Sequence, residues 1–111
     1  MTIDLTAQLR TDLSSAGAGL RRGLWVSFLD AYGFEVAIAS SANWIGVDLQ
    51  HGNLGLDDLA GILRVTERAG VPLLSRMRSH DAGSIARAID AGVNGLIIPG
   101  VDDATQAQAL V

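Results

Sequence analysis

Residues 44–52, with the sequence Trp-Ile-Gly-Val-Asp-Leu-Gln-His-Gly, join an apolar run to a polar end, and this stretch decides the fold. The run Trp44–Asp48 is apolar at consecutive positions rather than at alternate ones, which is typical of a strand buried on both faces of a parallel sheet. A loop follows at 50–55, and Leu56–Ala69 then has the apolar spacing of a helix that ends at Gly70. The stretch therefore predicts one βα unit.

Similar units recur on both sides of this one. Three further apolar runs predict strands, at Gly23–Phe28, Val71–Leu74 and Gly95–Ile98. Four more segments have helical spacing or capping residues: a leading helix with Leu5, Leu9 and Leu13, a helix from Asp30 to Ala39, a helix over Ser84–Ala91, and a last helix capped by Asp102 or Asp103. Such βα repeats with short loops predict a parallel α/β protein with right-handed crossovers. A flavodoxin-like sheet and part of a (βα)8 barrel both satisfy this periodicity.

The composition indicates a folded protein and excludes several classes. The 111 residues suffice for one ordinary domain, and apolar residues make up 49% of them. The net charge is −4 and the longest basic run is Arg21–Arg22, which argues against a nucleic-acid partner. No apolar run reaches the roughly 18 residues of a membrane span. We expect a cytoplasmic protein without nucleic-acid or membrane partners.

Cysteine and lysine are both absent from the chain. Without cysteine there is no disulfide, no thiolate nucleophile and no cysteine-based metal site. Without lysine there is no Schiff-base catalysis and no Walker-type phosphate lysine.

Polar side chains follow two of the predicted strands at the points where they end. Asp48 closes the second strand with His51 three positions on, and Arg76 closes the third with Arg78, His80 and Asp81 following. Because functional groups gather at the carboxyl ends of parallel strands, we expect these residues to converge on one rim. A carboxylate on one imidazole nitrogen of His51 would leave the other nitrogen as a general base, and Arg76 would offer its guanidinium to a carboxylate or an enolate.

A purely structural interpretation of these residues stays open. Asp48 then caps a turn, His51 is a surface residue, and Arg76 forms a salt bridge to Asp48 or Asp81. Arg78 is interpreted as a solvated loop arginine. The pair His80–Asp81 fits a turn and helix cap better than a metal site.

Four spaced motifs resemble the HpcH/HpaI aldolase family, which are class II pyruvate aldolases of the phosphoenolpyruvate/pyruvate (βα)8 barrel superfamily. The resemblance runs from about Gly23 to the last residue and implies the amino-terminal half of a barrel. The motifs are Gly23-Leu-Trp25, Trp44–Gly52, Arg76 with Asp81, and Ile89–Val101.

The resemblance also implies roles for individual residues. His51 matches a catalytic histidine in proton transfer, Asp48 the carboxylate that pairs with it, and Arg76 the arginine that stabilises the pyruvate enolate. Trp25 matches a tryptophan near the substrate pocket, so Trp25 and Arg76 are the expected substrate-binding residues. Gln50 departs from the family, where many members have glutamate.

The implied substrate is a small 2-oxo acid, cleaved to pyruvate and an aldehyde. The implied cofactor is a divalent metal (Mg²⁺, Mn²⁺ or Co²⁺), with no organic cofactor, and the absence of lysine also favours a metal over an iminium. The family's metal ligands would lie beyond Val111, so no residue of this chain is expected to bind the metal. Four βα units are half of a barrel of about 250 residues.

We therefore expect residues 1–22 to form a helix and lead-in, and residues 23–111 a partial barrel. On this interpretation the chain is a fragment with little or no aldolase activity alone, and it forms a homo-oligomer. The alternatives are a non-catalytic, self-associating module and another lyase of the superfamily, of the citrate-lyase-beta type. A response-regulator receiver is disfavoured, since the first strand ends in Val-Ser-Phe and lysine is absent.

Overall fold

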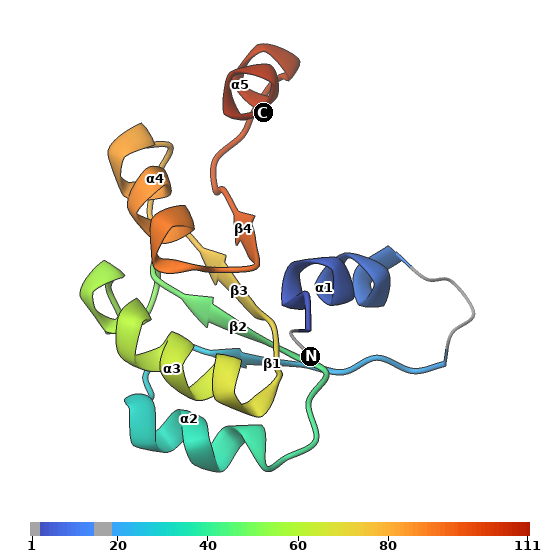
Figure 1. The fold of residues 1–111 in the computed structure, drawn as a ribbon. Helices are drawn as coiled ribbons and strands as arrows, with labels where there is room; N and C mark the ends of the chain where they lie inside the picture. The colour runs from blue at the N-terminus through green and yellow to red at the C-terminus, as the bar shows by residue number, and fades with distance from the viewer. Residues whose placement is uncertain (1–2, 15–18) are drawn as a thin grey trace.

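The computed structural model describes residues 3–14 and 19–111, and these residues form a parallel sheet with helices on both faces (Figure 1). The strands are β1 (Gly23–Val26), β2 (Trp44–Asp48), β3 (Leu73–Arg76) and β4 (Gly95–Ile97). The helices are α1 (Leu5–Ser14), α2 (Ala31–Ile38), α3 (Leu59–Ala69), α4 (Ala82–Ala91) and α5 (Ala104–Leu110), and a 3-10 turn, η1 (Leu56–Asp58), precedes α3.

The strands lie side by side in the order β1-β2-β3-β4, and all three pairings are parallel. A doubly wound sheet reverses its strand order at a switch point, whereas a (βα)8 barrel adds each strand to the same edge. The strand order therefore answers the question that periodicity left open. The fold is a set of four βα units of a TIM barrel.

The hydrophobic core lies between the sheet and the helices α2, α3 and α4, which cover one face (Figure 1). Ile45 and Leu73 point from the strands into this core, and Phe34 and Ile62 meet them from α2 and α3, each almost inaccessible to solvent. Helix α1 lies on the other face. There a Cβ added to Gly95 would stand 3.1 Å from the side chain of Leu9, so the glycine permits the helix to approach β4 closely.

Capping residues fix the helix ends where the sequence indicates them. Asp30 and Asp81 accept hydrogen bonds from the backbone N–H groups of Gly33 and Ser84, both at 2.8 Å, and Asp103 caps α5 in the same way. Gly70 ends α3 with φ +72°, a left-handed conformation that favours glycine.

Several predicted boundaries differ from the observed ones by one to three residues. β1 ends at Val26 instead of Phe28, and α3 begins at Leu59 because η1 occupies the preceding three residues. β3 begins at Leu73 and includes Arg76, because the backbone of Asp48 and Arg76 pairs across β2 and β3. Arg76 is therefore held by the sheet rather than by a loop.

Two asparagines close the amino ends of the strand pairs, and we name them the asparagine clamps. The N–H of Asn43 donates to the carbonyl of Arg22 at 2.7 Å, and the N–H of Arg22 donates back to the Asn43 side chain at 2.9 Å. Asn94 and Leu73 repeat this exchange at 2.8 and 2.9 Å. Each clamp joins residues 21 positions apart, so the first and second halves of the sheet begin in the same way.

In the described ranges, no helix is both long enough and apolar enough to cross a membrane. The division of the chain at residue 22 stays a prediction, and residues 1–2 and 15–18 of its first part lie outside the described residues. Helix α1 covers most of the rest of that part.

Candidate functional site

An ion pair at the carboxyl ends of β2 and β3 is the centre of the site. Asp48 and Arg76 are neighbours in the strand register, which places both side chains on the same face of the sheet. The Arg76 Nε donates to Asp48 Oδ1 at 3.0 Å and its Nη2 donates to Oδ2 at 2.5 Å. This bidentate contact fixes the plane of the guanidinium as well as its position.

The carboxylate of Asp48 is buried, with 2% of the residue exposed, and is held in its charged form. The hydrogen bonds from Arg76 lower its pKa far below the ordinary value, against the effect of burial. The backbone N–H groups of Gln50 and His51 add to this effect, donating to Oδ1 at 2.9 and 3.2 Å. The same contact raises the pKa of Arg76. Asp48 therefore orients both the arginine and the loop that follows β2.

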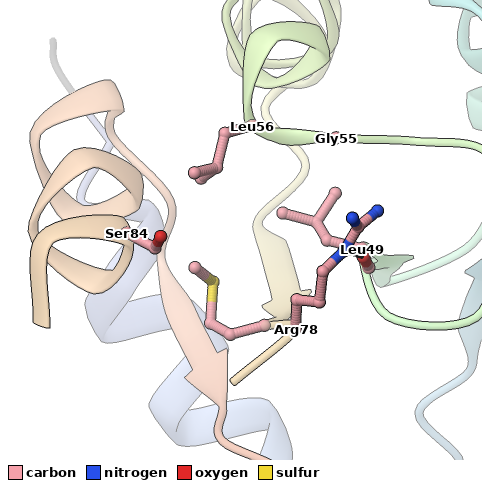
Figure 2. A pocket seen from close by; sticks show the side chains of 6 residues that line it. Leu49, Gly55, Leu56, Arg78 and Ser84 are labelled. Carbon is pink, nitrogen blue, oxygen red and sulfur yellow. Dashed lines mark hydrogen bonds between the residues drawn. The ribbon is translucent and has the colours of Figure 1, made fainter. Parts of the chain in front are cut away.

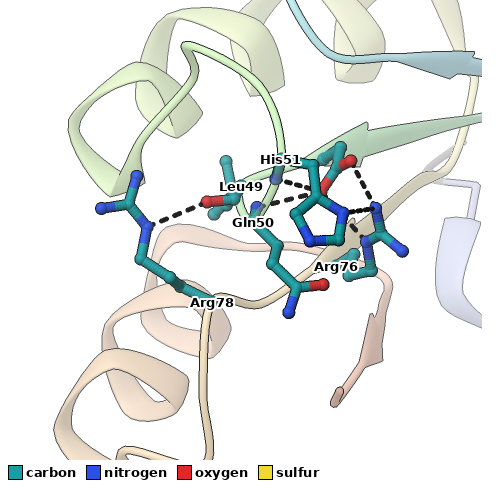
Figure 3. Close-up of polar contacts among 6 residues, drawn as sticks. Leu49, Gln50, His51, Arg76 and Arg78 are labelled. Carbon is teal, nitrogen blue, oxygen red and sulfur yellow. Dashed lines mark hydrogen bonds and ion pairs between the residues drawn. The ribbon is translucent and has the colours of Figure 1, made fainter. Parts of the chain in front are cut away.

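His51 is exposed and lies beside this pair, and Figure 3 shows its ring next to Arg76. Its ring Nδ1 is 3.0 Å from Nη2 of Arg76. The expected contact between the Asp48 carboxylate and the imidazole ring is not what the geometry gives. Because Arg76 engages both carboxylate oxygens, Asp48 reaches His51 only through the backbone N–H, and the guanidinium takes the place next to the ring.

Trp25, on β1, completes one wall of the site. The Cζ of Arg76 lies 5.3 Å from the centroid of the Trp25 ring, within cation–π range. The neighbour of Trp25 on β2 is Gly46. A Cβ added to Gly46 would stand 2.5 Å from the indole, so the glycine lets the ring lie across β2. The indole remains 43% exposed and is open to a ligand on its other side.

The loop of His51 is anchored at Gly52, through a contact that the sequence did not indicate. Gly52 packs against the end of β1 so closely that an added Cβ would stand 1.9 Å from the carbonyl oxygen of Ser27, and the next residue, Asn53, donates its N–H to that oxygen at 3.0 Å. Arg78, interpreted as a solvated arginine, donates from Nε to the carbonyl of Leu49 at 3.1 Å (Figure 3). A contact between a loop glycine and the end of a strand leaves no pattern in a single sequence from which it could be predicted.

His80 and Asp81 make their contacts elsewhere than in this cluster. Nε2 of His80 meets the carbonyl of Pro99 at 2.6 Å, and Asp81 caps α4 as expected. Hydrogen bonds from Ser84 lower the pKa of Asp81. The convergence on one rim therefore holds for Asp48, His51 and Arg76.

A cavity of about 260 Å³ opens beside the site, between the loop after β2 and the start of α4 (Figure 2). Its lining is mainly apolar and is formed by Leu49, Gly55, Leu56, Met77, Arg78 and Ser84. None of the three residues of the polar cluster lines it. We therefore place the candidate chemistry at the cluster and not in this cavity.

The described residues do not provide a metal site. No group of three or more histidine, aspartate or glutamate side chains among them is arranged to hold an ion. Both oxygens of Asp48, the buried carboxylate of the cluster, already accept hydrogen bonds from Arg76.

Fold and site together define a segment of a parallel (βα)8 barrel with a charged cluster at the carboxyl ends of its strands. Comparison with known proteins refines this class. The chain is 32% identical over 90 residues to hydroxypyruvate/pyruvate aldolase from Pseudomonas aeruginosa, covering 80% of this chain and 33% of that protein. It is 28% identical over 109 residues to 4-hydroxy-2-oxovalerate aldolase from Novosphingobium aromaticivorans, covering 93% and 42%.

Among solved structures, the HpcH/HpaI aldolase from Desulfitobacterium hafniense superposes with a TM-score of 0.79 at 21% identity, over 96% of this chain and 39% of that one. No family model matches the sequence. The named relatives confirm the resemblance to HpcH/HpaI aldolases, and the structural match confirms the fold. The chain spans about a third to two fifths of the length of these relatives.

Proposed function

We propose that this chain supplies the proton-transfer and enolate-stabilising groups of an aldolase that cleaves or forms 4-hydroxy-2-oxo acids, with pyruvate and an aldehyde as the other partners of the reaction. One observation carries the proposal: a buried carboxylate presents Arg76 in a fixed plane beside the exposed His51. The names of the relatives, which are aldolases of pyruvate, hydroxypyruvate and 4-hydroxy-2-oxovalerate, support the substrate class.

Arg76 has the geometry for binding the 2-oxo acid. Its Nε and Nη2 are occupied by Asp48 and His51, while Nη1 makes no hydrogen bond to the described residues. That free edge can donate to the carboxylate or to the oxygen on which negative charge develops. A fixed cation at such a position stabilises the enolate without reorganisation during the reaction.

In the cleavage direction the reaction transfers one proton and breaks one carbon–carbon bond. The hydroxyl at C4 loses its proton as the C3–C4 bond breaks, the aldehyde leaves, and the electron pair remains on the enolate of pyruvate, which then takes a proton at C3. We assign the proton transfer to His51 and the charge stabilisation to Arg76, oriented by Asp48. Trp25 forms the wall against which the substrate packs.

We infer that the proposed enzyme uses a divalent metal as well, as the resemblance to class II aldolases implies; the 111 residues themselves contain no lysine that could form an iminium. The described residues do not fit such an ion, so no step above is assigned to it.

A chimera tests the proposal without assuming where the native protein begins or ends. The matched stretch of the Pseudomonas aeruginosa aldolase is replaced by this chain, and pyruvate release from a 4-hydroxy-2-oxo acid is measured with Mg²⁺ or Mn²⁺. We expect release by the chimera, loss of release in its His51→Ala form, and little or none from the 111-residue chain alone. A folded but inactive chimera would contradict the proposal, and a substrate panel that includes citrate-type acids would distinguish the lyase alternative.

A self-associating module is the second candidate, favoured by the open face of the sheet. Trp25 and Ile97 are 43% and 38% exposed on that face, and β1 and β4 are the outer strands of the described sheet. Unpaired parallel edges promote association. Light scattering should then report a dimer or larger species of the 111-residue chain, and a stable monomer would count against it.

A further inference from the structure

We propose that Arg76 is a positioning residue for His51, holding its neutral imidazole in the tautomer that carries the proton on Nε2. The exposed nitrogen of His51 then offers a hydrogen-bond donor to a substrate oxygen. The sequence had indicated the reverse arrangement, with that nitrogen free as a base. The inference rests on the proposed function for its meaning in catalysis, although the tautomer itself is a property of the chain alone.

The argument starts from what a guanidinium can do. Every nitrogen of an arginine side chain is a donor, and none accepts a hydrogen bond. Nδ1 of His51 lies 3.0 Å from Nη2 of Arg76, so Nδ1 must accept. A neutral imidazole that accepts at Nδ1 carries its proton on Nε2.

Arg76 cannot turn away to relieve this requirement. Its Nε and Nη2 both donate to Asp48, which fixes the plane of the group, and the second N–H of Nη2 is the one that faces His51. The backbone N–H of His51 is bound to the same carboxylate, at 3.2 Å from Oδ1. The loop and the arginine are therefore held by one anchor, and the tautomer follows from that geometry.

A catalytic consequence follows from the same contact. With the proton on Nε2, His51 stabilises charge on a substrate oxygen by donating a hydrogen bond, the role of a neutral histidine rather than of a base. Nε2 could accept a proton only in the other tautomer, with the ring proton on Nδ1, and that N–H would then be set against the guanidinium. His51 can therefore act as a base only after its exposed ring turns out of the contact with Arg76.

The second histidine provides an internal reference. Nε2 of His80 faces the carbonyl oxygen of Pro99 at 2.6 Å, and a carbonyl can only accept. His80 must also carry its proton on Nε2, but for a different reason. An obligate acceptor faces Nε2 of His80, whereas an obligate donor faces Nδ1 of His51. A change at Arg76 should alter the tautomer of the first histidine and leave that of the second.

The experiment is a long-range ¹H–¹⁵N correlation spectrum of the 111-residue chain with ¹⁵N-labelled histidine, recorded about two pH units above the ordinary imidazole pKa of about 6.5. We expect an unprotonated Nδ1 and a protonated Nε2 for His51. A protonated Nδ1, or a pattern averaged between the two tautomers, would overturn the proposal. No substrate is present, so this outcome is independent of whether the chimera releases pyruvate.

Three variants separate positioning from general stability. Arg76→Met removes the donor and should give an averaged pattern for His51, Arg76→Lys keeps a cationic donor and should restore part of the preference, and Arg78→Met is the matched control that should change neither histidine. An unaltered His51 pattern in folded Arg76→Met would contradict the proposal. If Arg76→Met unfolds, the pattern of His80 changes too, and the spectrum of the unmodified chain remains the deciding measurement.

Discussion

The two ends of the sheet are closed by hydrogen bonds in different ways. At the amino end, the asparagine clamps are neutral and reciprocal: Asn43 and Asn94 each exchange N–H and carbonyl groups with one partner. At the carboxyl end, charged groups take the same place between strands, and the buried carboxylate of Asp48 leaves one edge of Arg76 without a described partner. The difference agrees with the proposal that the carboxyl end binds substrate while the amino end contributes stability, as in other barrels of this type.

The largest expected effect comes from breaking the charged end. In the chimera, Arg76→Met should lower kcat for pyruvate release on the order of 10²- to 10³-fold, because a preorganised donor to the developing charge is removed. Steady-state kinetics measure the loss. Arg78 lies two residues beyond Arg76, just after β3, and bonds to the carbonyl of Leu49. Arg78→Met should change kcat far less, and an equal loss in both variants would show that general local damage explains the effect.

A smaller loss is expected when the loop that carries His51 is displaced. In Gly52→Ala the new Cβ would meet the carbonyl oxygen of Ser27, so the loop must move away from β1. Misplacing a catalytic group by about 1 Å can cost about 100-fold in rate, and we expect a loss of up to that size in kcat of the chimera. Gly55→Ala is the matched control, since nothing lies within 4 Å of its added Cβ. Equal rates for the two variants would contradict the role of Gly52.

The fold was largely predictable because its signals are local. Continuous apolar runs locate the strands, and side chains such as Asp30 and Asp81 mark helix starts by caps that act over three residues. The strand order needed the structure, since periodicity is equally compatible with a doubly wound sheet. The end of β3 was misplaced because Arg76 is polar and its place in the strand depends on pairing with β2.

The residues that form the site could be predicted from the sequence, but the contacts among them could not. Strand ends brought Asp48, His51 and Arg76 together as expected. Whether Asp48 binds the guanidinium of Arg76 or the ring of His51 depends on the register of β2 and β3, a relation across 28 residues that no local pattern contains. The anchoring by Gly52 also depends on a contact between segments distant in sequence.

The two asparagine clamps should differ in strength. Both make the same exchange between strands, and Asn94 also donates from Nδ2 to Thr6 Oγ1 at 3.1 Å. Asn94→Ala leaves the N–H of the buried Leu73 without a partner and should lower the free energy of unfolding by about 1–3 kcal/mol. Asn43→Ala exposes the N–H of Arg22 to water and should cost about 0.5–1.5 kcal/mol. Urea denaturation of the 111-residue chain measures both. A larger loss of unfolding free energy for Asn43→Ala than for Asn94→Ala would contradict the ranking by burial. A change in the His51 tautomer in the NMR spectrum of either variant would show that the two ends of the sheet are not independent.

The smallest expected effect is on the pH dependence of the free energy of unfolding. It distinguishes the two ends of the sheet because only the charged end titrates. The pKa of Asp48 is lowered in the folded state by the hydrogen bonds from Arg76, while in the unfolded chain it returns to about 3.9. Between these values the unfolded state binds more protons, so the free energy of unfolding rises with pH. The contribution is complete above about pH 4 and is lost as the pH falls toward the folded-state pKa.

Denaturation of the unmodified chain should therefore show a loss of stability on acidification below about pH 4. Asp48→Asn should flatten that loss, whereas Asn43→Ala should shift the whole curve and keep its slope, since an amide does not titrate. Asp81→Asn is the carboxylate control: the pKa of the exposed Asp81 is also lowered, but only by hydrogen bonds from Ser84, so its flattening should be the smaller of the two. Equal flattening in the two carboxylate variants would mean that the bidentate pair with Arg76 adds nothing specific to the acid stability of the charged end.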